Sequence, residues 1–151
     1  MKNELVILMA EDNRGHFVLT KSYFARQGVR NHMVWLADGE QTINFLFTED
    51  GYARDYPGKE FILFLDIRMP KIDGWEVLRR IRESPKLENM PVVMLTAMEN
   101  PEHIEHGKQL GCSAYIIKPV KYSSYINAMK KVGVFPTIVS NGVELISKRS
   151  A

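Results

Sequence analysis

The segment Phe61-Ile62-Leu63-Phe64-Leu65-Asp66 places five consecutive apolar residues before a single carboxylate. An unbroken apolar run of this length is typical of a strand buried on both faces, as in a parallel sheet covered by helices. Met69-Pro70 follows shortly afterwards, and a proline forces the residue before it into an extended conformation, so regular structure ends there. Asp66 therefore lies where a buried strand meets solvent. In open α/β sheets this edge carries the functional groups.

Apolar segments with the same character recur along the chain and alternate with segments of helical periodicity. The predicted strands are Leu5–Ala10, Asn31–Ala37, the Phe61–Asp66 segment, Met90–Leu95 and Ala114–Ile117. The predicted helices are residues 14–27, the segments that follow Asp38, Asp73 and Asn100, and a last one carrying Tyr122, Tyr125, Ile126 and Met129. Strictly alternating strands and helices predict an α/β fold, with a parallel sheet, helices on both faces and right-handed crossovers.

Helix boundaries are indicated by residues with known preferences for helix ends. Asp38 and Asp73 are good N-caps, and Asp73-Gly74-Trp75-Glu76 resembles a capping box. Gly28 and Gly111 are expected to end the helices before them. From Val132 onward the pattern dissolves around a short apolar run, Thr137-Ile138-Val139, which predicts either a frayed end or a docking segment.

Composition excludes several classes of protein. The 151 residues suit one domain, and a net charge of +2 is too small to indicate nucleic-acid binding. The single cysteine, Cys112, excludes an internal disulfide and fits a reducing compartment. Leu5–Ala10 is too short for a signal peptide or a membrane span. We therefore expect a cytoplasmic protein that contacts neither nucleic acid nor membrane.

The ends of four predicted strands carry complementary polar groups, namely Glu11-Asp12, Asp66, Thr96 and Lys118. In a parallel sheet these ends lie along one edge, where neighbouring carboxylates repel each other and require a positive partner. Carboxylate oxygens suit Mg²⁺. A divalent ion on one side of Asp66 and Lys118 on the other would make a site for a phosphoryl group, with Asp66 as the nucleophile and Thr96 as a hydrogen-bond donor.

These residues, in this order, resemble the receiver domain of two-component response regulators. Glu11-Asp12 resemble its acidic pair, and Asp66 its phospho-accepting aspartate, followed by Met69-Pro70 and Asp73-Gly74. Thr96-Ala97 and Tyr115 resemble the switch hydroxyl with its small neighbour and the switch aromatic. Lys118-Pro119 resemble the family's lysine and cis proline. The resemblance runs from about Leu5 to about Val132.

The resemblance implies a fold, a cofactor and a mechanism. The fold is a flavodoxin-like, doubly wound sheet of five parallel strands in the order 2-1-3-4-5. Mg²⁺ is bound by Glu11, Asp12, Asp66 and the backbone carbonyl of Arg68. A histidine kinase, hybrid kinase or phosphotransfer protein donates the phosphoryl group to Asp66. Thr96 then moves toward that group, Tyr115 rotates inward, and the surface of the fourth helix, fifth strand and fifth helix changes shape.

Two departures point to a subgroup. Residues 49–60 form a polar loop longer than the connection requires, and residues 134–151 extend beyond a receiver domain of residues 1–133. Both resemble the single-domain regulators that pair with bacterial phytochromes and hybrid kinases, which are often dimers. The dimer would use the face of the fourth helix, fifth strand and fifth helix, or the C-terminal extension. Arg68 and Met98 occupy variable positions that tune the lifetime of the phosphoryl group.

Other functions remain as alternatives. An aspartate-nucleophile phosphatase of the haloacid dehalogenase type shares the aspartate, threonine and lysine, but it requires a second Asp where this chain has Arg68. A pseudo-receiver would bind partners without accepting phosphate, although such modules usually lack an acid or the lysine.

Single residues outside this set also have alternative roles. His103 and His106 have a spacing that can hold a metal. Tyr115 could simply cap the sheet, Trp35 is expected in the core, and Trp75 either shields the site or packs.

Overall fold

The central sheet has five parallel strands in the order β2-β1-β3-β4-β5. The computed structural model describes residues 4–47, 56, 58–96, 101–118 and 121–147. The strands are β1 (Leu5–Ala10), β2 (Met33–Leu36), β3 (Glu60–Asp66), β4 (Val92–Thr96) and β5 (Ala114–Ile117). The predicted fold class and strand order are confirmed.

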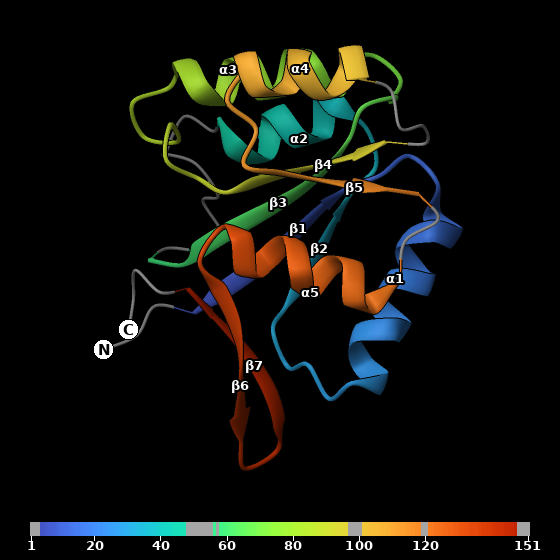
Figure 1. Ribbon diagram of the computed structural model, residues 1–151, viewed down its shortest axis with the longest axis vertical. Coiled ribbons are helices and arrows are strands. Elements are labelled where there is room, and N and C mark those ends of the chain that lie inside the picture. Colours follow the sequence, from blue (N-terminus) through green and yellow to red (C-terminus); the bar gives the residue numbers. More distant parts are fainter. Residues whose placement is uncertain (1–3, 48–55, 57, 97–100, 119–120, 148–151) are drawn as a thin grey trace.

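Five helices cover the two faces of this sheet (Figure 1). They are α1 (Arg14–Arg26), α2 (Gly39–Leu46), α3 (Gly74–Glu83), α4 (Pro101–Gln109) and α5 (Tyr122–Lys131). Helices α1 and α5 lie on one face, and α2, α3 and α4 lie on the other. Among the described residues, no helix has both the length and the apolar character that crossing a membrane requires.

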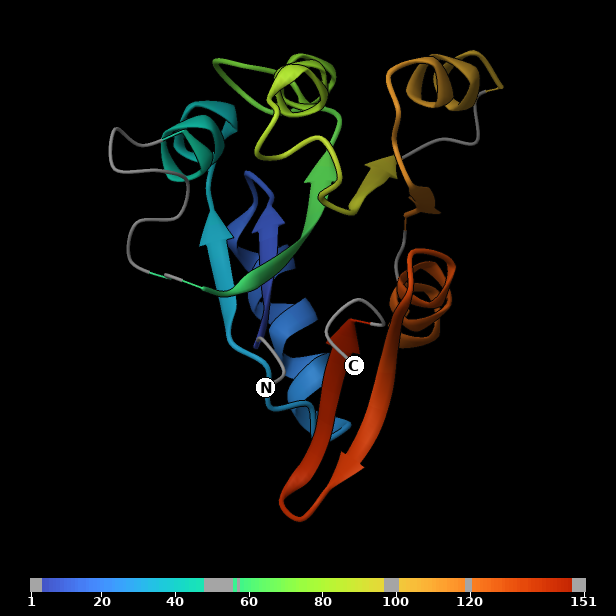
Figure 2. The same ribbon diagram turned by 90° about the vertical axis from the view of Figure 1, so that its left-hand side faces the viewer.

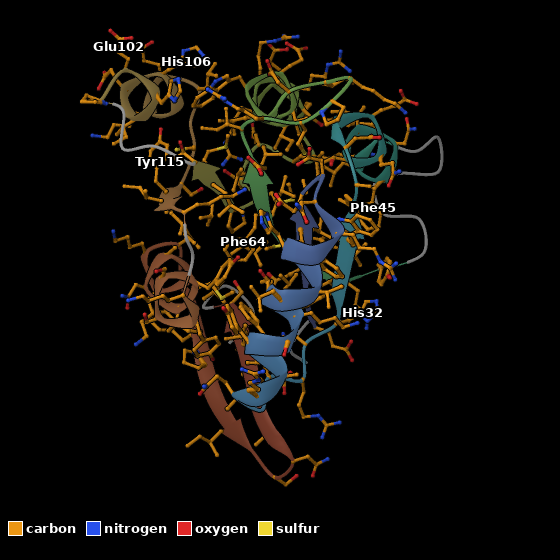
Figure 3. The ribbon with its side chains drawn as sticks, turned by 90° about the vertical axis from the view of Figure 1, so that its right-hand side faces the viewer. His32, Phe45, Phe64, Glu102, His106 and Tyr115 are labelled. Atoms are coloured by element: carbon orange, nitrogen blue, oxygen red, sulfur yellow. The ribbon has the colours of Figure 1, made fainter. Side chains whose placement is uncertain are left out.

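The middle strands are buried on both faces, as the unbroken apolar runs predict. Every residue of β1 and all of β3 after Glu60 are buried. Phe64 points toward α1 and α5 (Figure 3), where the centroid of its ring lies 5.1 Å from that of Tyr125. Leu63 and Leu65 pack with residues of α3 in the core cluster on the other face of the sheet. Burial of this apolar surface is the main favourable contribution to folding.

The predicted helix ends are found at Asp38, Asp73, Gly28 and Gly111. The side chain of Asp38 accepts from the Gln41 amide at 2.8 Å, and that of Asp73 accepts from the Glu76 amide at 2.9 Å. Gly28 and Gly111 have φ of 80° and 83°, a region that favours glycine. The predicted cap Asn100 lies outside the described residues.

The C-terminal segment forms a β-hairpin that the sequence pattern did not predict. Strands β6 (Val134–Val139) and β7 (Gly142–Ser147) pair antiparallel beyond the end of α5 (Figure 2). One end of the hairpin joins the core, since Val134 and Leu145 are almost fully buried. Ile138, near the turn, is 89% exposed. The mixture of exposed apolar residues with Pro136 explains why the segment lacks the alternation typical of a strand.

The hairpin is fixed to the part of the molecule that holds the five-stranded sheet by the residues that follow α1. The Asn31 side chain donates to the carbonyls of Leu5 and Leu145 at 2.8 and 2.9 Å and accepts from the Leu145 amide at 2.7 Å. The Val143 amide donates to the Gly28 carbonyl at 2.7 Å. A Cβ at Gly142 would lie 2.3 Å from that carbonyl oxygen, so this approach requires glycine.

Most of the predicted loop at residues 49–60 lies outside the described residues. Its C-terminal part includes Tyr56, whose hydroxyl is 3.0 Å from Nε2 of His32. The Tyr56 ring also meets Phe45 of α2 and Phe61 of β3 at centroid distances of 5.8 and 6.2 Å. Tyr56 therefore anchors this part of the chain beside α2.

Replacing Asn31 with alanine should destabilise the protein by roughly 1–3 kcal/mol, because the carbonyls of Leu5 and Leu145 lose a donor in a partly buried place. Urea unfolding measures the loss, and hydrogen exchange at the Leu145 amide should accelerate beyond that of the sheet. Asn127→Ala, at an exposed position of α5, is the matched control. Equal stability of the two variants would show that the Asn31 bonds do not hold the hairpin.

Candidate functional site

Backbone hydrogen bonds extend the sheet by one residue at its carboxyl edge and align the polar strand ends. The amide of Glu11 donates to Leu36, that of Ile67 to Leu95, and that of Lys118 to Thr96, at 3.1, 3.2 and 2.8 Å. As a result Glu11, Asp66, Thr96 and Lys118 line a single cavity of about 440 Å³. The sequence prediction that these strand ends share one edge agrees with this geometry.

Lys118 is the positive partner that the carboxylates require. Its Nζ lies 2.6 Å from Oδ2 of Asp66 and 3.3 Å from Oε2 of Glu11. Burial lowers the pKa of the Lys118 ammonium, but the hydrogen bonds and charges of Asp66 and Glu11 together outweigh it and raise the pKa above its ordinary value. Lys118 therefore stays charged next to Asp66.

Glu11 is the most deeply buried acid of the site, with 2% of its surface exposed. Burial, followed by the hydrogen bond and charge of Asp66, raises the pKa of Glu11 to about 7, although Lys118 and His16 oppose the shift. Without a metal ion, the ionised form of Glu11 is therefore unfavourable, because it is buried and lies next to the carboxylate of Asp66.

Glu11 is held in place by two residues, His16 and Trp35, which the sequence analysis did not assign to the site. Nδ1 of His16, in the first turn of α1, lies 2.7 Å from Oε1 of Glu11. The indole N–H of Trp35 donates to the Glu11 backbone carbonyl at 2.6 Å, and the ring stacks on Phe17 at 5.8 Å. His16 follows the acidic pair in the sequence, which was an available signal, whereas the Trp35 bond depends on the β1–β2 register.

The acidic residues fit a divalent cation. Ligand oxygens of Glu11, Asp12 and Asp66 all lie within 4.8 Å of one another, with Glu11 and Asp66 buried and Asp12 exposed. Three hard oxygen donors are the ligand set that Mg²⁺ prefers, with water completing the coordination. Oδ1 of Asp66 accepts from the Arg68 amide at 3.2 Å, so the backbone of Arg68 passes close to the acids. The Arg68 carbonyl as a ligand stays a prediction.

The close packing of α3 against the Asp66 segment explains why a glycine, Gly74, follows Asp73. The Gly74 amide donates to the Ile67 carbonyl at 2.8 Å. A Cβ at Gly74 would lie 2.4 Å from the Asp66 carbonyl oxygen. Helix α3 can therefore begin against the Asp66 segment only if residue 74 has no side chain.

The predicted switch residues lie on neighbouring strands. Thr96 is buried at the end of β4 and lines the cavity. Tyr115 of β5 is half-buried and donates its hydroxyl hydrogen to the Ile104 carbonyl of α4 at 2.5 Å; Figure 3 shows it beside the helix that carries His106. Ala97, Met98 and Pro119, with the predicted cis bond, lie outside the described residues.

Trp75 packs between α3 and α4 and contacts both histidines considered as a metal site. Its ring meets His103 and His106 at centroid distances of 6.0 and 4.6 Å, with near-perpendicular planes. Trp75 and His103 also line a hollow of about 540 Å³ next to the site. Among the described residues, the metal-type cluster found is Glu11, Asp12 and Asp66, and it includes neither histidine.

The chain matches known response regulators over most of its length. The sequence profile of the response regulator receiver domain matches residues 7–130. The probable methanogenesis regulatory protein FilR2 of Methanothrix harundinacea is 30% identical over 131 residues, covering 87% of this chain and 83% of FilR2.

Two solved structures add detail. The bacteriophytochrome response regulator RtBRR superposes with a TM-score of 0.79 at 30% identity, covering 94% of this chain and 84% of RtBRR. The Mn²⁺-bound form of response regulator Rcp1 superposes with a TM-score of 0.64 at 27% identity, covering 84% of this chain and 88% of Rcp1. With its sheet order, its edge of acids and lysine, and the matched profile, the chain belongs to the response regulator receiver family of two-component signalling.

Proposed function

We propose that this protein is a phospho-accepting switch in which Asp66 takes a phosphoryl group from a histidine kinase or phosphotransfer protein. The observation that carries the proposal is the Asp66 carboxylate, bound to Lys118 at 2.6 Å and grouped with two further acids in a cavity of about 440 Å³. A nucleophilic carboxylate between a cation site and a lysine is the arrangement that phosphoryl transfer requires.

Asp66, Lys118 and Thr96 each take a separate part in the proposed transfer. An oxygen of Asp66 attacks phosphorus, the P–N bond to the donor histidine breaks, and its electron pair stays on the departing imidazole. Lys118 moves from Asp66 to the phosphoryl oxygens, and the Thr96 hydroxyl donates to another of them. When bound, Mg²⁺ supplies charge neutralisation for the acids and the phosphoryl oxygens. Receiver domains typically hold Mg²⁺ or Mn²⁺ at an acidic cluster, and response regulator Rcp1 has a solved Mn²⁺-bound form.

The alternatives fit the site less well. A phosphatase of the haloacid dehalogenase type would use an acid at position 68, where the chain has Arg68. A pseudo-receiver is disfavoured because no acid and no lysine is missing: Lys118 contacts Glu11 and Asp66, and Asp12 lies in the same group of acids. Family members generally act as signalling switches and not as enzymes, and we propose only self-catalysed phosphoryl transfer and hydrolysis here.

The partners and organisation are proposed from the family resemblance. We expect a hybrid or phytochrome-like kinase, in line with the similarity to RtBRR. We propose a receiver domain of residues 1–133, a C-terminal extension of residues 134–151, and a cytoplasmic location. A second copy of the chain would bind through the α4-β5-α5 face, where Ile117 is exposed, or through the hairpin, where Phe135 and Ile138 are exposed.

Incubation with acetyl phosphate and Mg²⁺ should add one phosphoryl group to the wild type and none to Asp66→Asn, because the amide is not a nucleophile. Intact-mass spectrometry measures the gain. A folded wild type that gains no mass would favour the pseudo-receiver. A phosphoryl group on Asp66→Asn would place the acceptor elsewhere.

The affinity for Mg²⁺ should rise with pH through about 7, the pKa of Glu11 in the metal-free protein. The ion needs the ionised carboxylate, so a proton on Glu11 competes with it below that pH. Calorimetric titration should give binding about tenfold weaker at pH 6 than at pH 8, as expected for one competing proton. Glu11→Gln, which has no proton to release, should bind weakly at both pH values. A wild type with pH-independent affinity would contradict this account.

If the hairpin joins two copies, Ile138→Asp should lower the mass of the particle in solution, since it places a charge on the 89% exposed apolar tip. Light scattering before and after phosphorylation measures the mass. Thr137→Asp, at the neighbouring exposed position, is the control for added charge alone. A dimer that is insensitive to Ile138→Asp would assign the interface to the α4-β5-α5 face.

A further inference from the structure

Gly107 stands out in α4 because a glycine in the interior of a short helix is unfavourable. Alanine would stabilise such a helix, and nothing about an ordinary helical backbone requires glycine there. Within α4, all of which is described, Gly107 is the buried residue, and the helix turns this bare position toward the sheet. Its presence therefore calls for a reason in the packing.

That reason is the side chain of Tyr115. A Cβ on residue 107 would lie 1.8 Å from the Tyr115 hydroxyl oxygen and 2.7 Å from Cζ. The tip of the tyrosine ring thus occupies the volume that any other residue at position 107 would fill. Gly107 and the carbonyls of His103 and Ile104 form what we call the α4 socket.

Hydrogen bonds hold the tyrosine in the α4 socket. Its hydroxyl lies 2.5 Å from the Ile104 carbonyl oxygen and 3.3 Å from that of His103, one turn before Gly107. Burial, followed by the neighbouring Cys112, raises the pKa of Tyr115 well above its ordinary value, so the hydroxyl keeps the proton that it donates. Tyr115 and α4 are therefore joined, and neither can move away without breaking these bonds.

The joined pair is connected to the proposed phosphorylation site through the pairing of β4 with β5. Tyr115 pairs with Met94 of β4, and Ile117 on the same strand pairs with Thr96, the proposed switch hydroxyl. Movement of Tyr115 toward Thr96 would empty the α4 socket and release the helix.

We propose that Gly107 is a positioning residue for the switch, whose missing side chain seats Tyr115 on α4 and so stabilises the unphosphorylated arrangement. The proposal rests on the phospho-accepting function proposed above. It predicts that a methyl group at position 107 expels the tyrosine and shifts the population toward the phosphorylated arrangement.

The first test follows Tyr115 itself and needs no phosphoryl chemistry. The protein is labelled with 3-fluorotyrosine, and the Tyr115 signal among the six tyrosines is assigned by its loss in Tyr115→Phe. Gly107→Ala should move this ¹⁹F signal in the unmodified protein, whereas Gln109→Ala, at an exposed position of the same helix, should leave it in place. An unmoved signal in Gly107→Ala would overturn the α4 socket.

The second test measures coupling to the site with beryllofluoride and Mg²⁺, which mimic a phosphoryl group on a carboxylate. Gly107→Ala should bind beryllofluoride about tenfold more tightly than the wild type, a typical coupling between linked sites. In a Tyr115→Ala background, Gly107→Ala should change the affinity less than about twofold, because no ring remains to be expelled. Unchanged or weaker binding in Gly107→Ala, with the ¹⁹F signal displaced, would overturn the link to the switch.

Two further results distinguish a failure of the α4 socket from a failure of the phospho-accepting function. Failure of the wild type to bind beryllofluoride would count against the phospho-accepting function and leave the ¹⁹F test of the α4 socket intact. Should Gly107→Ala not fold, Tyr115→Phe removes the hydroxyl bonds without adding volume and should also tighten beryllofluoride binding, though by less. Weaker or equal binding by Tyr115→Phe would then contradict the proposal.

Discussion

The ammonium group of Lys118 is the charge on which the site depends. It lies against Asp66 and Glu11, two buried carboxylates that would otherwise repel each other across the end of the sheet. Breaking such a buried pair leaves an uncompensated charge, which costs far more than the loss of a surface ion pair. In the transfer proposed above, the same lysine releases Asp66 when a phosphoryl group arrives, so it would both stabilise the resting site and prepare it for reaction.

The sheet register brings these charges together. Lys118 is 107 residues from Glu11 in sequence, yet both amides extend the backbone ladder by one residue at the same edge. Close backbone approach requires glycine next to this edge, at Gly74 against the Asp66 carbonyl, and at Gly107 against the Tyr115 ring. Gly74 thus allows α3 to begin against the Asp66 segment, and Gly107 leaves the space that the Tyr115 ring occupies.

Sequence reasoning predicted what depends on local pattern. The run from Phe61 to Leu65 predicted a strand buried on both faces, and Asp38 and Asp73 predicted helix starts that the structure contains. It did not predict the hairpin, because Pro136 and exposed Ile138 interrupt the alternation of β6, or the contact of Gly107 with Tyr115, which joins residues of separate elements. His16 was missed although it follows the acidic pair closely, because its position in the sequence does not show that the first turn of α1 brings its ring to the buried Glu11. The roles assigned to the site residues remain proposals.

The placement of the two tryptophans gives the molecule built-in optical probes. The indole of Trp35 is hydrogen-bonded to Glu11 behind the acids, and that of Trp75 lies against His106 on the opposite helical layer. With only two such fluorophores in the chain, replacing one by phenylalanine isolates the emission of the other. One emission band then reports on the carboxylates and the second on the contact between α3 and α4. The order of events at these two places can therefore be resolved in time on unlabelled protein.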